Sequence, residues 1–299
     1  MTDVVPVEND VSHQLIEECM LLANESVCRF LAQHDIVQLH RIHEEPDPES
    51  INELEEMFRL GGVRAVNLTD RRNLAELLYD VRDMAPAHAW YTSVLRAMKR
   101  AEYSTNAIGH YGLAKDYYAH FTSPIRRYPD LVTHRLLQAV LGKKETPYSP
   151  EELDDTATHS SEREQVATEA EREITELKII RFFAEQLDSG RSRIYEAIVV
   201  DVRNMGAFVD IPAVRAGGLV HVSDLVGDFF DYNPDKNELR GRRSGAVLKT
   251  GSRFNVVVSR VDSAKRRLDF APADMEILLE QLAPPRAKRR RTGKKRKKS

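Results

Sequence analysis

The chain has 299 residues, of which 41% are hydrophobic and 30% charged, which fits a globular protein with enough apolar residues for a core. It contains no run of about 18 apolar residues, so a membrane-spanning helix is excluded on sequence grounds, and its N-terminus lacks the basic and then apolar layout of a signal peptide. The net charge of −3 hides an asymmetry, because Arg286 to Ser299 hold ten Lys or Arg and no acid. A basic tail on an acidic body indicates a polyanionic ligand, and nucleic acid is the expected one.

Apolar residues recur at helical spacing through the first two thirds of the chain. Ser149-Pro-Glu-Glu152 and Ser161-Glu-Arg-Glu164 both match a capping box, and the second is expected to begin a long charged helix. The predicted helices are 11–33 with Ser12 as cap, one from Ile51 to Phe58 ending at Gly61-Gly62, one opened by Asp70, 86–102, one begun by Pro129 and ending at Gly142, and one ending near Leu187.

The two cysteines, Cys19 and Cys28, lie nine residues apart on the first predicted helix. They cannot reach each other there for a disulfide. We therefore expect a reducing cytoplasm as the compartment.

The hydrophobic period changes from 3.6 to 2 at Gly190. Strands of this length over about 80 residues fit a small closed barrel. The sequence after Pro285 is of low complexity, and residues 273–299 are expected to form a disordered tail. The predicted strands are 194–202, 207–211, 219–222, 253–261 and 267–270.

The sharpest motif is His120-Phe-Thr-Ser-Pro-Ile-Arg-Arg-Tyr-Pro-Asp130. It places Arg126 and Arg127 just before a helix N-terminus, where unpaired N–H groups and a partial positive charge favour an anion. A guanidinium binds phosphate bidentately, so the pair is a candidate phosphate clamp, with Phe121 and Tyr128 as stacking faces. The alternative is an ordinary turn whose arginines pair with acids, which is the commoner arrangement for an isolated Arg-Arg.

This motif resembles the signature of the RNB catalytic domain in the ribonuclease II and ribonuclease R family. Two upstream blocks agree with that family in order and spacing: residues 12–25, and residues 96–103 followed by 109–114. The resemblance covers about residues 11 to 187. It implies a multidomain α+β protein. We expect an N-terminal extension (1–10), a mainly helical C-terminal part of an RNB domain (11–188), an S1-like barrel (190–272) and a basic disordered tail (273–299).

The resemblance also implies an activity, the processive Mg²⁺-dependent 3′→5′ hydrolysis of RNA to nucleoside 5′-monophosphates. By position, Arg126 is similar to the family arginine that contacts the scissile phosphate, and Arg127 would support phosphate binding or structure. Glu171 falls near a glutamate at the family's active-site channel.

The family holds Mg²⁺ with an Asp-x-Asp-Asp type run, which lies upstream of the part that this chain matches. Such catalysis needs hard oxygen ligands packed together. The adjacent Asp154-Asp155 is interpreted as a solvated helix start, so we expect no metal ligands in this chain. The cluster His34, His40 and His43 is assigned to a surface loop.

Two hypotheses remain open. The chain is a truncated, split or misannotated exoribonuclease whose metal-binding half is encoded upstream, or it is a non-catalytic module that only binds RNA. In either case an incomplete RNB domain is expected to expose apolar helix faces, which predicts poor solubility or a partner that completes the fold.

Residues 190–272 resemble an S1-type RNA-binding domain, which is an OB barrel. Asn204–Val209 and Gly218–Leu225 match its glycine turn and third-strand pattern. Stacking of bases on exposed aromatic rings needs no sequence readout. The alternative for Phe208 is a place in the core. The candidate RNA-binding residues here are Phe208 and His221 for stacking, with Tyr195 or Phe229 as additions, and Arg203, Lys249 and Arg253 for the RNA backbone.

Overall fold

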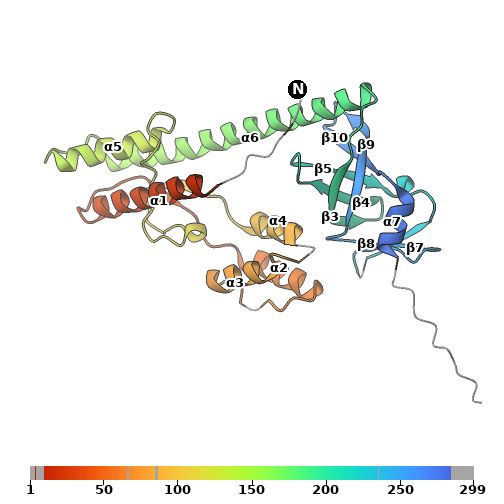
Figure 1. Cartoon of the computed structure of the whole chain (residues 1–299). Coiled ribbons are helices and arrows are strands. Elements are labelled where there is room, and N and C mark those ends of the chain that lie inside the picture. The colour runs from red at the N-terminus through yellow and green to blue at the C-terminus, as the bar shows by residue number, and fades with distance from the viewer. Residues whose placement is uncertain (1–3, 5–9, 66, 85–86, 235, 284–299) are drawn as a thin grey trace, which may run out of the picture. The chain divides into compact units, whose positions relative to one another are not determined.

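The computed structural model describes residues 4, 10–65, 67–84, 87–234 and 236–283 (Figure 1). The chain divides into a largely helical unit, Val5–Lys178, and a β-barrel unit, Met1–Val4 with Ile179–Ser299. The predicted α+β, multidomain fold class is confirmed. Among the described residues, none of the helices is both long and apolar enough to cross a membrane. The basic tail Arg286–Ser299 and most of the expected N-terminal extension lie outside the described residues.

Helix α1 (Val11–Ala32) opens the helical unit. Its N-cap is Asp10, whose carboxylate accepts a hydrogen bond from the backbone N–H of His13, so the prediction of Ser12 as cap was wrong. The apolar residues whose helical spacing predicts this helix are only partly buried, because Leu15 and Leu22 are exposed. The buried side chains of this helix are Asn24, Cys28 and Leu31.

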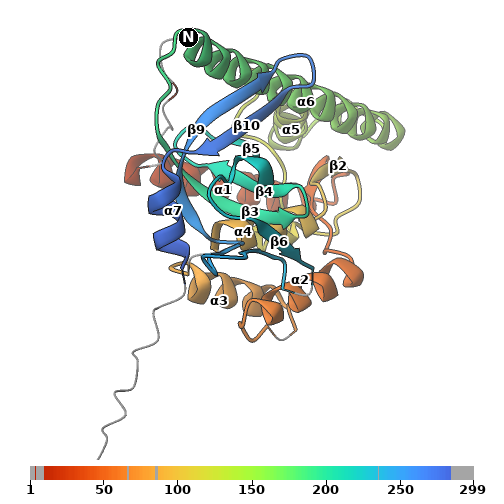
Figure 2. The same ribbon diagram turned by 90° about the vertical axis from the view of Figure 1, so that its right-hand side faces the viewer.

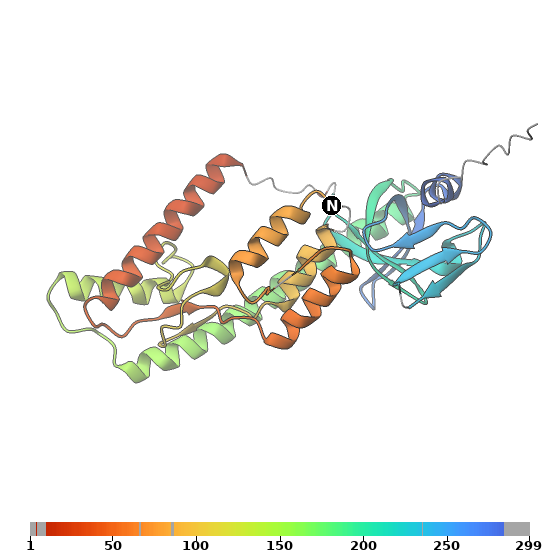
Figure 3. The same cartoon turned by 90° about the horizontal axis from the view of Figure 1, so that it is seen from below.

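Three helices form a separate small core (Figure 3): α2 (Pro48–Leu60), α3 (Arg71–Val81) and α4 (Ala87–Ala97). Phe58 and Trp90 pack there with ring centroids 5.2 Å apart. The predicted end of α2 at Gly61 and the Asp70 cap of α3 are confirmed. The predicted helix 86–102 is too long, because strand β2 (Glu102–Ser104) follows and pairs with β1 (His40–Ile42).

The histidines near β1 contradict the surface-loop prediction in part. His40 and His43 are buried, while His34 is exposed. Nε2 of His43 donates to the carbonyl of Lys99 at 2.7 Å, and its Nδ1 accepts from the N–H of Gly112 at 2.9 Å. Both ring nitrogens are therefore satisfied by backbone, which identifies His43 as a structural residue.

Helices α5 (Tyr128–Leu141) and α6 (Pro150–Asp188) pack with α1 around a second core that includes Leu31, Leu136 and Leu153. The capping box at Ser149 is confirmed, since Ser149 and Glu152 exchange side chain to backbone hydrogen bonds. The second predicted box is wrong. Ser161 lies inside the continuous α6, and its hydroxyl accepts from the N–H of Tyr103 at 2.9 Å.

The barrel unit closes in the strand order β10-β5-β4-β3-β9, and β9 and β10 are its longest hairpin (Figure 2). The five predicted strands are confirmed with small shifts at their ends. Sequence patterns missed a three-stranded sheet, β6-β7-β8, and helix α7, which lies inside the segment expected to be disordered. The bounds are β3 Tyr195–Arg203, β4 Gly206–Ile211, β5 Ala216–His221, β6 Phe230–Asn233, β7 Glu238–Gly241, β8 Val247–Lys249, β9 Arg253–Asp262, β10 Arg267–Pro272, α7 Met275–Leu282, and the short 3₁₀ helices Tyr111–Leu113 and Val222–Asp224.

Candidate functional site

The motif His120–Asp130 forms a tight turn that leads into α5. The carbonyl of Ser123 accepts hydrogen bonds from the N–H groups of Arg126 and Arg127, at 3.3 and 3.1 Å. Arg127 is the N-cap residue of α5, and Pro129 lies in its first turn as predicted. The side chains of Ile125 and Arg126 are exposed at the tip of the turn. Arg126 is therefore free to meet a ligand.

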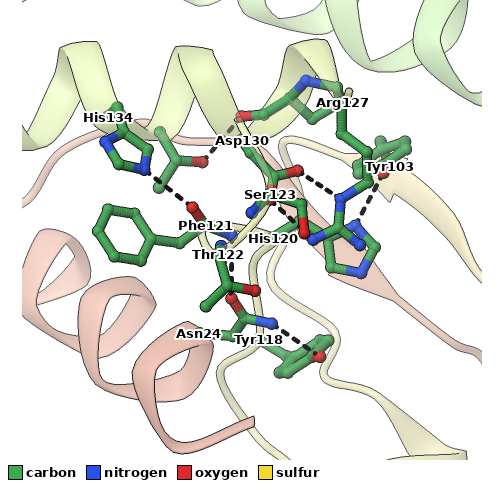
Figure 4. A network of polar contacts seen from close by, with 12 residues as sticks. Asn24, Tyr103, Tyr118, His120, Phe121, Thr122, Ser123, Arg127, Asp130 and His134 are labelled. Carbon is green, nitrogen blue, oxygen red and sulfur yellow. Dashed lines mark hydrogen bonds and ion pairs between the residues drawn. The ribbon is translucent and has the colours of Figure 1, made fainter. Parts of the chain in front are cut away.

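The turn is held in place by Asp130, whose side chain is fully buried (Figure 4). Its carboxylate accepts hydrogen bonds from Nε and Nη2 of Arg127, both at 2.8 Å, which together form a bidentate ion pair. It also accepts a hydrogen bond from the N–H of Ser123 at 2.7 Å. A planar guanidinium fits a carboxylate in this bidentate way. Of the two expected phosphate-binding arginines, one is thus already engaged in structure.

Asn24 of α1 holds the other side of the motif (Figure 4). Its carbonyl oxygen accepts the N–H groups of Phe121 and Thr122, at 3.0 and 3.2 Å, and its amide donates to the hydroxyl of Tyr118 at 3.0 Å. Sequence reasoning missed this residue. Asn24 lies at a position of α1 that the apolar spacing assigns to the interior, and a buried amide side chain needs hydrogen-bond partners. That position was the signal that could have identified Asn24 as a functional candidate.

A neutral His–Tyr pair lies beside the turn. The hydroxyl of Tyr103 is 2.8 Å from Nδ1 of His120. Burial, together with the nearby charges of Arg127 and Arg41, lowers the pKa of His120 to about 3. Burial also raises the pKa of Tyr103 to about 12. Both groups are uncharged at neutral pH, so the positive charge of this region comes from its arginines.

A groove of about 640 Å³ runs between α1 and the motif. Its lining joins apolar and polar side chains of α1, including Met20 and Asn24, to Tyr118 and Arg127. The groove is mostly apolar, and its lining includes the carboxylate of Glu17 as well as Arg127, whose charge is already paired with Asp130. The motif therefore adjoins a concave, mostly apolar surface, whereas the unpaired positive charge lies on Arg126 outside the groove lining.

The predicted aromatic and acidic residues of this region lie in different settings. The Phe121 ring stacks on His134, with centroids 4.1 Å apart and planes 13° apart, so one of its faces is already covered. Tyr128 is 51% exposed, so its aromatic ring remains accessible to solvent. Glu171 lies on α6 within residues 165–176, where every side chain is exposed. Within the part of the chain that the structure describes, no hydrogen bond or ion pair joins Glu171 to the arginine turn; its backbone carbonyl accepts from the hydroxyl of Thr175.

The described residues contain no group of three or more His, Cys, Asp or Glu side chains placed to hold a metal ion. Asp130 is saturated by Arg127 and Ser123, and Asp154 accepts a hydrogen bond from the hydroxyl of Thr105. The donor set of this part of the chain therefore does not fit a catalytic metal, which needs several free oxygen ligands packed together.

The barrel presents three of the predicted RNA-binding residues on one outer face. Arg203 of β3 and His221 of β5 both pair with Gly206 of β4, so their side chains lie on the same side of the sheet. Phe208 is two residues further along β4, the central strand of the three, and its side chain therefore points to that same side. The guanidinium of Arg203 lies 5.2 Å from the centre of the Phe208 ring. Phe208 is half-buried and points away from the core, so its outer ring face is available for stacking.

The remaining barrel candidates lie elsewhere. Arg253 is opposite Ile198, five residues along β3 from Arg203, and it faces Glu196 at 3.7 Å. Lys249 is exposed at the end of β8. Tyr195 is wrong as a stacking surface, because it is buried and its hydroxyl accepts from the amide of Gln186. Phe229 is exposed.

Two family models match the chain. The RNB domain matches residues 1–143, and the S1 RNA binding domain matches residues 192–271. Among curated relatives, Ribonuclease R of Thermotoga maritima is 37% identical over 90% of this chain and 38% of its own length. Ribonuclease R of Escherichia coli is 35% identical over 95% of this chain and 36% of its own length. The chain thus spans less than two fifths of the length of these relatives.

Solved structures also resemble this chain in fold. Mycoplasma genitalium RNase R in complex with ribose methylated single-stranded RNA has a TM-score of 0.74 and 25% identity, over 89% of this chain and 42% of that one. The yeast pseudonuclease Ssd1 has a TM-score of 0.66 and 21% identity, over 88% of this chain and 31% of that one, which is a likeness of fold alone.

Proposed function

The chain belongs to the RNB family as a ribonuclease R-like protein, and we propose that it serves 3′→5′ exonucleolytic hydrolysis of RNA to nucleoside 5′-monophosphates by holding the RNA backbone at Arg126. The observation that carries this proposal is the exposed Arg126 on a turn fixed by Asn24 and Asp130, with no carboxylate partner among the described residues. An unneutralised guanidinium on a rigid turn is suited to a phosphodiester. The barrel face around Phe208 would hold further single-stranded RNA.

Nucleases of this family are metal-dependent, and we expect Mg²⁺ as the ion. When bound, the ion would activate water and stabilise the leaving oxygen. The described residues supply no donor set for it, so we assign them only to binding and positioning: Arg126 to the scissile phosphate, Arg127 to the turn, and Glu171 to the channel wall.

The partner we propose for hydrolysis is the metal-binding part of an RNB domain, whether it is in the same polypeptide or in another. Supporting this, α1 exposes Val11, Leu15, Ile16 and Leu22, an apolar surface that a folded partner would cover. The two free cysteines agree with a reducing cytoplasm. A non-catalytic RNA-binding role is the second candidate, and it is favoured by the absence of a metal donor set from the described residues.

Incubation of the purified chain with 3′-labelled single-stranded RNA and Mg²⁺ separates the two candidates. We expect retained RNA without mononucleotide release, and release once the metal-binding part is supplied. Mononucleotide release by the chain alone that survives re-purification would contradict the binding-only role. Failure to retain RNA at all would contradict both candidates.

Arg126→Ala is expected to weaken binding of single-stranded RNA by about fivefold and to lower the slope of log affinity against log salt by about one, because one phosphate contact is lost. Arg126→Lys keeps the charge and should recover most of the affinity. Fluorescence anisotropy with a labelled oligouridine at several salt concentrations measures both quantities. An unchanged affinity and slope for Arg126→Ala would exclude the proposed contact.

Phe208→Ala is expected to weaken RNA binding by the loss of one stacked base, worth about 1–3 kcal/mol. Because the ring is on the outer face of the barrel, the unfolding midpoint should change little. Phe208→Tyr keeps a stacking ring and is the matched control. If Phe208→Ala lowers stability while RNA affinity stays the same, the ring has a packing role instead.

A further inference from the structure

The outer side of α5 carries an arginine that is held by tyrosines instead of an acid. Arg135 is exposed, and its Nη1 donates to the hydroxyl of Tyr148 at 2.7 Å. Hydrogen bonding to Tyr148 raises the pKa of Arg135, and Tyr128 adds to the same shift. A phenol oxygen is a neutral acceptor. The guanidinium is therefore fixed in place while its positive charge remains.

This arrangement differs from that of other held arginines in the helical unit. Arg29, Arg41, Arg59 and Arg127 each form an ion pair with a carboxylate. Arg135 has no carboxylate within ion-pair distance among the residues that the structure describes. Since it has five N–H donors and, among the described residues, phenolic partners alone, donors remain available for an anion.

Arg135 has Tyr148 as its hydrogen-bond partner and Tyr128 as a further electrostatic neighbour, and we call these three residues the Tyr-Arg-Tyr cluster. Tyr128 and Arg135 are seven residues apart in α5, so they lie on one side of the helix about 10 Å apart at the backbone. Tyr148 packs partly against the core that includes Leu136, which anchors its ring. Tyr128 keeps half of its surface exposed.

We propose that the Tyr-Arg-Tyr cluster is a nucleotide subsite for single-stranded RNA, in which Arg135 binds a phosphodiester and the Tyr128 ring stacks on a base. The inference rests on the proposed function, because Arg126 lies two residues before Tyr128 and would contact another part of the same strand. A guanidinium that is already positioned loses little entropy on binding, and a guanidinium binds phosphate bidentately. A stacked base accepts any sequence.

Anisotropy of a labelled oligouridine with the full chain tests the subsite. Arg135→Ala should weaken binding by about fivefold and lower the salt slope by about one. Tyr148→Phe keeps the ring in the core but releases the guanidinium, so affinity should fall by about twofold with the slope unchanged. Arg59→Ala removes one charge from an arginine that is paired with Glu56, and it should bind RNA as the parent chain does.

The outcomes separate this inference from the proposed function. If Arg135→Ala binds as tightly as the parent while Arg126→Ala and Phe208→Ala are weakened, the subsite is wrong and the proposed function stands. An equal loss in Arg135→Ala and Arg59→Ala also overturns the subsite, because the effect is then one of net charge. If Arg135→Ala loses affinity for an acidic peptide but not for RNA, the ligand class is wrong. If the parent chain binds no RNA, both proposals fail.

Discussion

Asp130→Ala is expected to lower the free energy of unfolding of the helical unit by about 3 kcal/mol, the low end of the range for breaking a buried ion pair. The carboxylate is fully buried, and its removal leaves the Arg127 guanidinium, whose side chain is only 19% exposed, without its counter-charge. The N–H of Ser123 loses its acceptor as well. The low end is appropriate because Arg127 retains some access to water.

Chemical denaturation followed by tryptophan fluorescence measures this change, since the only tryptophan, Trp90, is buried in the helical unit. Far-UV circular dichroism follows α5 and α6 in the same samples. Glu56→Ala is the matched control, because Arg59 and Glu56 have the same spacing of three residues but are both exposed. An exposed pair contributes little, so the control midpoint should not move. Equal effects in the two variants would refute the locking role of Asp130.

The site was predictable where local chemistry determines it. The sequence alone predicts a helix that begins with a proline in its first turn and has two arginines just before it, and the structure has this arrangement. Which of the two arginines pairs with Asp130 and which remains exposed was not predictable. Arg127 turns toward Asp130, which is only three residues away, whereas Arg126 points outward; the choice depends on burial, which sequence spacing does not record.

Long-range partners account for most of the misses. Asn24 meets the motif from almost a hundred residues away, and the buried His43 is satisfied by backbone groups of Lys99 and Gly112. The sheet β6-β7-β8 was missed for another reason. Its strands have only three or four residues and are interrupted by charged and turn residues, so the alternating pattern never accumulates.

The barrel was predicted more fully, because its strands are long enough to show the alternating pattern. The glycine turn before β4 was expected from the resemblance of Asn204–Val209 to the S1-type domain. Its physical necessity comes from the neighbouring strand: a Cβ added at Gly206 would lie 2.2 Å from the carbonyl oxygen of Val220, and the residue has a φ of +152°. Only the assembled β4-β5 pair contains that contact.

Gly206→Ala is therefore expected to destabilise the barrel unit by about 3 kcal/mol or more, since both overpacking and an unsuitable φ oppose the new methyl group. The obstructing atoms are backbone, and β5 cannot move away without losing its hydrogen bonds to β4. Gly217→Ala is the control on the same strand pair, because its nearest neighbour would be at an ordinary 3.5 Å. Hydrogen exchange of peptides from β4 and β5 should show lost protection in the first variant only. RNA affinity should fall with it, because Phe208 and His221 are carried by these two strands. Equal protection in both variants would mean that the turn accommodates a side chain, and that the glycine is dispensable for the barrel.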